Sequence, residues 1–237
     1  MEKIHISFGD SQYNGSLKAL EESSNEYGSD KFITYTQDWL KTTSFWEENK
    51  EILIQPRGAG FWLWKPYIIL ETFKLYPEDT LVLYTDAAVI AVDKLSYIYD
   101  LCDNHDIVLF GIGTIHNNAT WTKEDVFQTL QLVSDEYRNG NQVSAAFSLW
   151  KNTKKSREFL EEWLRYMRDP ILSTDVPSKL SFKDERYKDN RHDQSILSLL
   201  SQRDRIQRYQ DPSQHGLNDL HPNGNFPQIF DHHRAKL

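Results

Sequence analysis

Residues 57–66 read Arg57-Gly58-Ala59-Gly60-Phe61-Trp62-Leu63-Trp64-Lys65-Pro66, and residues 83–88 read Leu83-Tyr84-Thr85-Asp86-Ala87-Ala88. The first stretch sets two glycines, which let a backbone approach a ligand closely, between two cations. The second ends an apolar run with one carboxylate. Cations for phosphates, indoles for an apolar or sugar surface and a carboxylate for a metal are the parts that a nucleotide-sugar site needs.

Strands and helices are predicted to alternate along the chain. This alternation predicts an α/β fold, a Rossmann-like sheet that is mostly parallel and flanked by helices, in a single domain spanning 1–237. The segment 169–190 is rich in Asp, Pro, Ser and Lys, which favours a mobile loop, and no periodicity is visible after about residue 206. Apolar runs predict strands at 3–8, 31–35, 80–84, 106–111 and 142–150, and helical spacing predicts helices at 17–27, 37–50, 60–76, 93–104, 153–167 and 192–200, with another beginning near 122.

Three strand ends are the expected places for a ligand, because ligands of such sheets lie beyond the carboxyl ends of the strands. Phe8-Gly9-Asp10, Asp86 and Gly111 each follow a predicted strand. We therefore expect these residues to lie along one edge of the sheet.

The composition limits the classes of function. A formal net charge of -8 argues against general nucleic-acid binding. A single cysteine, Cys102, allows no internal disulfide, which fits a reducing compartment. Neither a membrane-spanning apolar run nor a signal-peptide core is visible. We expect a cytoplasmic protein, a location compatible with peripheral membrane association.

The residues of the two quoted stretches each have a functional and a structural interpretation. Asp86 is either a ligand of Mg²⁺ or Mn²⁺ or a turn and helix-capping residue. Arg57 and Lys65 are either diphosphate and sugar contacts or solvated surface cations. Trp62 and Trp64 favour packing, because tryptophan is mostly buried.

Two more candidates lie near the end of the chain. Asp193 either stabilises a developing oxocarbenium centre or caps the helix that begins there. His232 and His233 are either imidazole ligands of a metal or part of a disordered polar tail. Phosphate-loop, dinucleotide-loop, G-x-S-x-G and H-E-x-x-H motifs are absent from the sequence, which leaves the commonest ATPases, dehydrogenases, hydrolases and zinc enzymes without support.

The blocks RGAGFWLWKP at 57–66, LYTDAA at 83–88 and RHDQSILSLL at 191–200 together resemble small bacterial and viral glycosyltransferases of GT-A type. The order of the blocks covers about 3–235. The resemblance implies a GT-A-like fold, a nucleotide-sugar donor such as a UDP-hexose, a divalent metal such as Mn²⁺ or Mg²⁺, and a glycan or other hydroxyl acceptor in polysaccharide biosynthesis.

The resemblance also assigns roles to residues. Asp193 and Gln194 would lie beside the donor sugar as the catalytic pair, as in retaining transferases. The metal would be held by Asp86 with help from His232 or His233. The donor contacts would be Phe8, Gly9, Asp10, Arg57, Trp64, Lys65 and Asp86.

One departure concerns the metal. The usual signature is Asp-x-Asp, and Ala88 stands at its second position. A single carboxylate holds a metal more weakly. Two other functions therefore stay open: a non-catalytic protein that binds a nucleotide sugar, and a glycoside hydrolase that uses Asp86 and Asp193 as its carboxylate pair.

Overall fold

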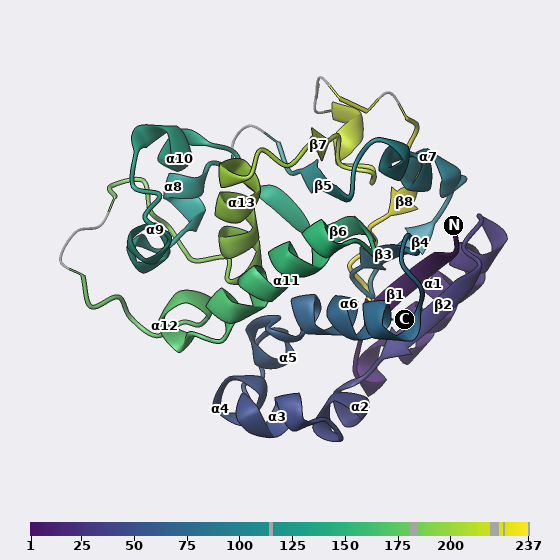
Figure 1. The fold of residues 1–237 in the computed structure, drawn as a ribbon, viewed down its shortest axis with the longest axis horizontal. Helices are drawn as coiled ribbons and strands as arrows, with labels where there is room; N and C mark the ends of the chain where they lie inside the picture. The colour runs from purple at the N-terminus through teal and green to yellow at the C-terminus, as the bar shows by residue number, and fades with distance from the viewer. Residues whose placement is uncertain (114–115, 181–183, 219–222, 225, 237) are drawn as a thin grey trace.

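The computed structural model describes residues 1–113, 116–180, 184–218, 223–224 and 226–236. Its centre is a six-stranded sheet in the order β2-β1-β3-β6-β5-β7, and a small second sheet pairs β4 with β8 (Figure 1). The strands are β1 (Lys3–Phe8), β2 (Lys31–Tyr35), β3 (Leu81–Thr85), β4 (Ile90–Ala91), β5 (Ile107–Gly111), β6 (Val143–Lys151), β7 (Arg208–Tyr209) and β8 (Phe230–Asp231).

The large sheet is mixed and mostly parallel, as the alternation of elements predicts. The pairs β1–β2, β1–β3 and β5–β7 are parallel. The strand β6 runs antiparallel to both β3 and β5. The first residues of β6 therefore lie beside the carboxyl ends of β3 and β5, where Thr85 pairs with Phe147 and Gly111 with Val143.

Both faces of the sheet are buried, because successive strand residues point to opposite sides. In β3, Val82 and Tyr84 belong to one apolar core, and Leu81 and Leu83 belong to the other. A strand buried on both faces has a continuous apolar sequence, which is the pattern of residues 81–84.

Helices cover the two faces. Figure 1 shows α6 (Trp64–Leu75), α11 (Lys154–Met167) and α13 (Asp193–Arg203) side by side over one face. The second core includes side chains from α1 (Asn14–Glu26) and α7 (Ser96–Tyr99). The remaining helices are η1 (Ser11–Tyr13), α2 (Gln37–Lys41), α3 (Ser44–Glu48), α4 (Lys50–Leu53), α5 (Gly58–Phe61), η2 (Asp100–Asp103), α8 (Asn118–Trp121), α9 (Glu124–Leu130), α10 (Asp135–Asn139), α12 (Pro170–Ser173) and η3 (Gly216–Asn218).

The structure differs from the predicted elements in several places. The predicted helix at 60–76 begins only at Trp64, because a left-handed turn at 59–62 precedes it, and the segment 169–190, expected to be a mobile loop, contains α12. The predicted helix at 37–50 is divided, because Thr36 and Thr43 each accept a hydrogen bond from a backbone N–H three residues on and begin a separate helix. The tail after 206 is not without structure: it supplies β7 to the main sheet and β8 to β4.

Parts of two predicted irregular segments lie outside the described residues, namely 181–183 and 219–222 with 225 and 237. In the part of the chain that the structure describes, no helix is long and apolar enough to span a membrane.

Candidate active site

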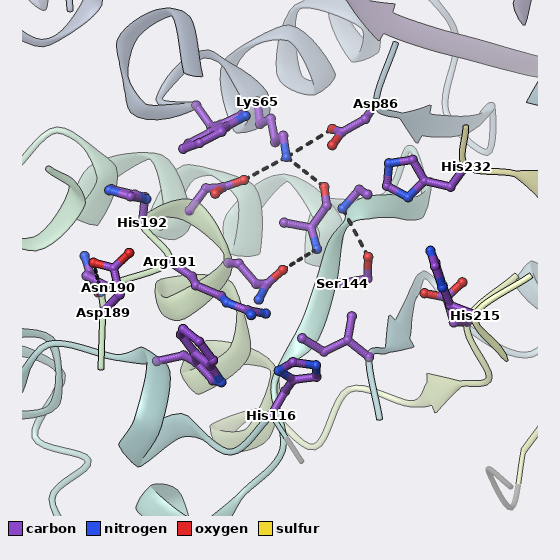
Figure 2. A pocket seen from close by; sticks show the side chains of 18 of the residues that line it. Lys65, Asp86, His116, Ser144, Asp189, Asn190, Arg191, His192, His215 and His232 are labelled. Carbon is purple, nitrogen blue, oxygen red and sulfur yellow. Dashed lines mark hydrogen bonds and ion pairs between the residues drawn. The ribbon is translucent and has the colours of Figure 1, made fainter. Parts of the chain in front are cut away.

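A pocket of about 920 Å³ lies at the carboxyl ends of β3 and β5 (Figure 2). Asp86 follows β3, Gly113 comes shortly after β5, and Ser144 to Ala146 of the antiparallel β6 form part of the wall between them. The size suits a small-molecule ligand. The lining residues are Arg57, Trp62, Lys65, Asp86, Ile112, Gly113, His116, Trp121, Ser144, Ala145, Ala146, Asp189, Asn190, Arg191, His192, Asp193, Gln194, Asp211, His215, His232 and Arg234.

A left-handed turn precedes the lysine of the pocket. Ala59, Gly60, Phe61 and Trp62 all have positive φ, and Trp62 ends the short helix α5 in the left-handed conformation. Left-handed backbone costs a non-glycine residue roughly 1–2 kcal/mol. The glycines of the motif therefore serve the turn itself: a Cβ on Gly60 would stand 2.6 Å from the Cα of Leu53.

Lys65 lies in the first turn of α6 and is 2% exposed. Its Nζ lies 2.8 Å from Asp193 Oδ2 and 3.3 Å from Asp86 Oδ1, and it donates a hydrogen bond of 2.8 Å to the Ala145 carbonyl. Burial alone would lower the pKa of Lys65, but the Asp193 and Asp86 carboxylates outweigh it and raise that pKa. The ammonium is therefore held in its charged form.

The two carboxylates differ in exposure. The Asp193 side chain is 5% exposed, whereas that of Asp86 is 33% exposed. Burial raises the pKa of Asp193, against the opposite effect of Lys65. The Tyr84 hydroxyl donates a hydrogen bond of 2.6 Å to Asp86 Oδ1, and burial raises the pKa of Tyr84 well above its usual value. Asp86 is thus the member of the cluster that a ligand can reach.

Beside this cluster, His192 holds a strained backbone with φ 52° and ψ -113°. Its buried ring lies 5.1 Å from the ring of Phe61 and 5.4 Å from that of Trp62, measured between centroids. Its Nε2 lies 2.9 Å from Asp175 Oδ1. The positive φ turns the chain between Arg191 and Asp193, so both neighbours of His192 line the pocket.

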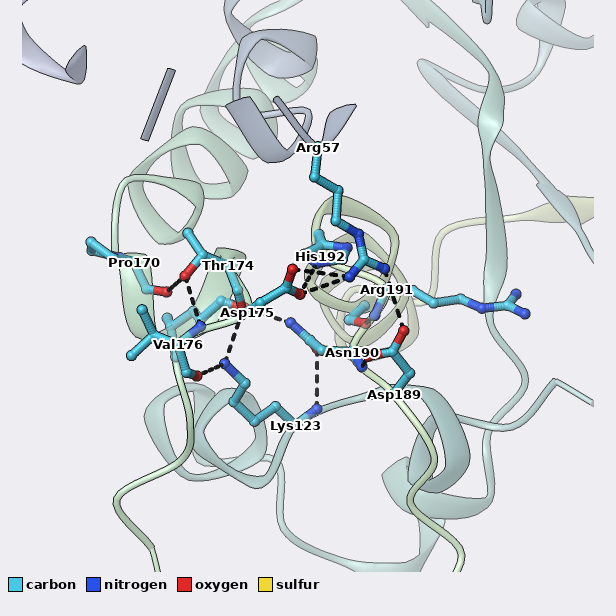
Figure 3. Close-up of polar contacts among 12 residues, drawn as sticks. Arg57, Lys123, Pro170, Thr174, Asp175, Val176, Asp189, Asn190, Arg191 and His192 are labelled. Atoms are coloured by element: carbon cyan, nitrogen blue, oxygen red, sulfur yellow. Dashed lines mark hydrogen bonds and ion pairs between the residues drawn. The ribbon is translucent and has the colours of Figure 1, made fainter. Parts of the chain in front are cut away.

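Arg57 is engaged on the same side (Figure 3). Its guanidinium donates to both oxygens of Asp175, at 2.9 and 3.0 Å, and to Asp189 at 3.3 Å. Burial would raise the pKa of the Asp175 carboxyl, but the hydrogen bonds from His192 and Arg57 lower it. To contact a diphosphate, Arg57 would have to exchange one of these partners for it.

The sequence-predicted site residues divide into two groups. Arg57, Lys65, Asp86, Asp193, Gln194 and His232 line the same pocket. Gln194 Oε1 accepts from the Ala145 N–H at 3.4 Å, so its amide faces β6. The predicted residues that do not line this pocket are Phe8, Gly9, Asp10, Trp64 and His233.

The residues outside the pocket have structural contacts of their own. The rings of Phe8 and Trp64 are stacked, with centroids 3.9 Å apart, and the Trp64 Nε1–H donates to the Gly58 carbonyl. The Asp10 side chain caps η1 by accepting from the Gln12 N–H.

Residues that the sequence analysis did not single out complete the pocket. Asp189 and Asn190 come from the segment expected to be a mobile loop, Trp121 is the last residue of α8, and His215 directly precedes η3. No periodicity marks such positions, so only the folded chain brings them to the site. Arg191 belongs to the quoted RHDQS block, and its positive charge two residues before Asp193 is the sequence feature that could have indicated a role in the site.

The donor set does not fit a metal bound in the absence of substrate. Among the described residues, no group of three or more His, Cys, Asp or Glu side chains could hold an ion. Figure 2 shows His232 near Asp86, but the ammonium of Lys65 already contacts that carboxylate. The Nδ1 atom of His233 accepts from the Ala235 N–H, and its Nε2 is buried. A site with one carboxylate and an adjacent ammonium binds a divalent cation weakly.

No protein-family model and no curated protein matches the sequence. Solved structures that resemble the chain include the galactosyltransferase LgtC in complex with donor and acceptor sugar analogs, at 15% identity and a TM-score of 0.48 over 98% of this chain and 87% of LgtC. Mouse xyloside xylosyltransferase 1 is 10% identical, with a TM-score of 0.48 over 88% of this chain and 84% of that one.

The glycosyltransferase GlyE of Streptococcus pneumoniae TIGR4 is 14% identical, with a TM-score of 0.45 over 90% of this chain. The chain spans 46% of the GlyE chain, less than half of its length. These similarities accompany the α/β fold with its mixed, mostly parallel sheet.

Proposed function

We propose that the chain, as one domain over 1–237, is a cytoplasmic glycosyltransferase. It would transfer a hexose from a nucleotide-diphosphate sugar, with uridine as the first expected base, to a hydroxyl group of a glycan or another acceptor. Synthesis of a surface polysaccharide is the expected context.

The observation that supports this proposal is the pairing of opposite charges in one pocket. The cluster of Lys65, Asp86 and Asp193 carries one excess negative charge, and Asp86 is its exposed member. An oxocarbenium-like centre develops positive charge, which a fixed carboxylate stabilises. Arg234 lines the same pocket and, within the described residues, forms no ion pair with a carboxylate. Its charge is available for the leaving diphosphate.

In this reaction the chain's own residues would act by position and charge. Lys65 would fix the orientation of Asp86 and Asp193 and limit their mutual repulsion. Asp193 would stabilise positive charge on the donor sugar through its field, a role that needs no exposed oxygen, and Gln194, which accepts from β6, would lie beside it. A glycosyltransferase needs little covalent chemistry from the protein, because binding energy holds donor and acceptor in the reactive geometry.

The geometry is less suited to the hydrolase alternative. A hydrolase needs two carboxyl groups that flank the glycosidic bond and act from separate positions. Asp86 and Asp193 contact the same ammonium, and Asp193 is 4% exposed. The pair would have to separate before both could reach a substrate.

A thermal-shift screen of UDP-, GDP- and CMP-sugars, with and without Mn²⁺, tests the proposal. At a ligand concentration one hundred times the dissociation constant, stabilisation of about 2.7 kcal/mol is expected from the correct donor. Because the donor set is poor, Mn²⁺ alone should add little stabilisation. No shift with any nucleotide, with or without metal, would contradict the transferase proposal.

The same donor distinguishes the proposed enzyme from the remaining alternative, a non-catalytic binding protein. A non-catalytic binding protein would be stabilised by the nucleotide sugar but would release no nucleotide diphosphate from it. Release measured over hours, at a protein concentration comparable with the donor, decides between binding and catalysis.

A further inference from the structure

Arg191 and Trp121 form a stacked pair on the wall of the pocket. The Arg191 guanidinium carbon lies 4.0 Å from the centroid of the Trp121 ring. Both residues line the pocket. We call this pair the Arg191 stack.

The stack is fixed by the backbone beneath it. The Arg191 N–H donates to the Trp121 carbonyl at 3.1 Å and to Ser195 Oγ at 2.9 Å. The Ser195 hydroxyl in turn donates to the same Trp121 carbonyl at 2.6 Å. These bonds join the end of α8 to the start of α13. The backbone from which the Arg191 side chain extends is therefore fixed relative to Trp121, and the stack on the indole adds a contact at the guanidinium itself.

The Arg191 guanidinium is stacked but not ion-paired in the part of the chain that the structure describes. Among the described residues, no carboxylate lies within ion-pair distance of its guanidinium, and no hydrogen bond from that group is found. Asp189 acts on it only at longer range, and burial lowers the pKa of Arg191. Figure 3 shows the guanidinium extending away from Asp189 and from the Arg57 contacts.

Two other cations of the pocket, Lys65 and Arg57, are neutralised. Lys65 contacts two carboxylates, and Arg57 contacts Asp175 and Asp189. A half-buried cation without a partner is unfavourable, because burial removes hydration and nothing replaces it. Such a group is retained where a ligand supplies the opposite charge.

We propose that the Arg191 stack is a subsite for a carboxylate or phosphate group of the substrate. The planar guanidinium offers its N–H groups as a fork, which matches the two oxygens of either anion, and the indole beneath it keeps the fork in place. The resemblance described in the sequence analysis assigns no role to Arg191 or Trp121.

The placement of the stack favours the acceptor as the source of the anion, an assignment that rests on the proposed function. Figure 2 shows Arg191 on the side of the pocket away from Asp86 and His232. A donor whose sugar lies at Asp193 and whose diphosphate lies toward Arg234 would leave the Arg191 side to the acceptor. The expected acceptor is an acidic sugar, either a uronic acid or a sugar phosphate.

Isothermal titration of the full chain at low salt tests the subsite. The probes are glucuronic acid, glucose 6-phosphate, neutral glucose, inorganic pyrophosphate and UDP. The variant is Arg191→Gln, and Arg191→Lys keeps the charge but loses the fork. Arg165→Gln is the matched control, because Arg165 also lies over an aromatic ring, that of Tyr166 at 4.1 Å, but on the exposed surface of α11.

We expect both acidic sugars to bind more tightly than glucose, and Arg191→Gln to weaken them by about ten- to hundred-fold, as for loss of a charge-assisted hydrogen bond. Arg191→Lys should weaken them less, and Arg165→Gln should change nothing. If UDP and pyrophosphate weaken instead, the subsite stands and its anion belongs to the donor.

Equal affinities of the wild type and Arg191→Gln for every anionic probe, at matched melting temperature, would overturn the subsite. Binding of nucleotide, measured with the UDP probe, tests the proposed function independently of the subsite. Acidic sugars that bind through Arg191 in a protein that binds no nucleotide would retain the subsite and reject the transferase.

Discussion

Replacement of Lys65 by methionine should be strongly destabilising. Methionine keeps most of the apolar stem but removes the ammonium that contacts Asp193 at 2.8 Å and Asp86 at 3.3 Å. Breaking a buried ion pair costs about 3–5 kcal/mol, chiefly because an uncompensated charge stays buried. The Asp193 contact should carry most of this loss, because the Asp86 side chain is 33% exposed and water screens its charge.

Thermal unfolding at pH 7 measures the melting temperature, and urea unfolding measures the free energy of unfolding. For a chain of this length we expect a decrease in the melting temperature of roughly 6–20 °C. Lys74→Met is the matched control: this lysine lies on the same helix and contacts Glu71 at 2.6 Å, but its side chain is 69% exposed. The control should change the free energy of unfolding by no more than about 0.5 kcal/mol.

Two further observations test the physical reason. The double variant Lys65→Met/Asp193→Asn should recover most of the loss, because it removes the buried charge along with its partner. The deficit of Lys65→Met should also shrink at low pH. Burial raises the pKa of Asp193 in the folded state, so the folded variant binds a proton that the unfolded chain does not, and its stability falls as the pH rises through that range. A loss below about 1 kcal/mol, or a double variant no more stable than the single one, would refute the reasoning.

The remaining predictions concern the backbone, the pH dependence and the chemistry. Gly60→Ala should lower the free energy of unfolding by more than about 2 kcal/mol in urea unfolding, because the new Cβ would stand 2.6 Å from the Leu53 Cα. Gly28→Ala is the control: Gly28 also has a positive φ but has open space around it, so the loss should be only about 1 kcal/mol. Equal losses for the two variants would contradict the steric explanation. Burial lowers the pKa of His5 to about 3, so between pH 6.5 and 3 the unfolded chain binds a proton that the folded chain does not. The free energy of unfolding should therefore fall as the pH falls through this window. An unchanged pH profile in His5→Gln would exclude His5 as the cause. Asp193→Asn should lower kcat sharply with nearly unchanged donor affinity if Asp193 serves the transition state, and turnover within a few-fold of the wild type at equal melting temperature would return it to a structural role.

Much of the main sheet could be predicted from the sequence, because its longer strands leave apolar patterns. The run at 81–84 is continuous since the strand is buried on both faces, and Asp86 follows it into the pocket as the strand-end argument expects. The strands β7 and β8 could not be predicted, because each has only two residues and the alternation of apolar and polar side chains needs a longer segment to be recognised. Strand β8 nevertheless directly precedes His232, which lines the pocket.

The candidate site was less predictable than the fold, because its contacts join distant segments. Lys65 meets Asp193 across 128 positions of sequence, and nothing local to either residue indicates that they form an ion pair. The glycines of the first motif were interpreted as allowing close approach of a ligand. The structure places them in a left-handed turn packed on Leu53 and Trp62, a tertiary requirement that a sequence pattern does not reveal.

The strained segments of the pocket support one another. The left-handed turn at 59–62 and the positive φ of His192 each place non-glycine residues in unfavourable backbone regions. Their side chains pack together, because the His192 ring lies between 5 and 6 Å from the rings of Phe61 and Trp62. Strained backbone persists only where the surroundings over-determine it, and it concentrates at functional sites. Here the first segment leads into Lys65 and the second separates Arg191 from Asp193. The ring packing that offsets this strain therefore fixes the backbone next to the charged groups of the pocket, which is the preorganisation that the proposed transfer would need.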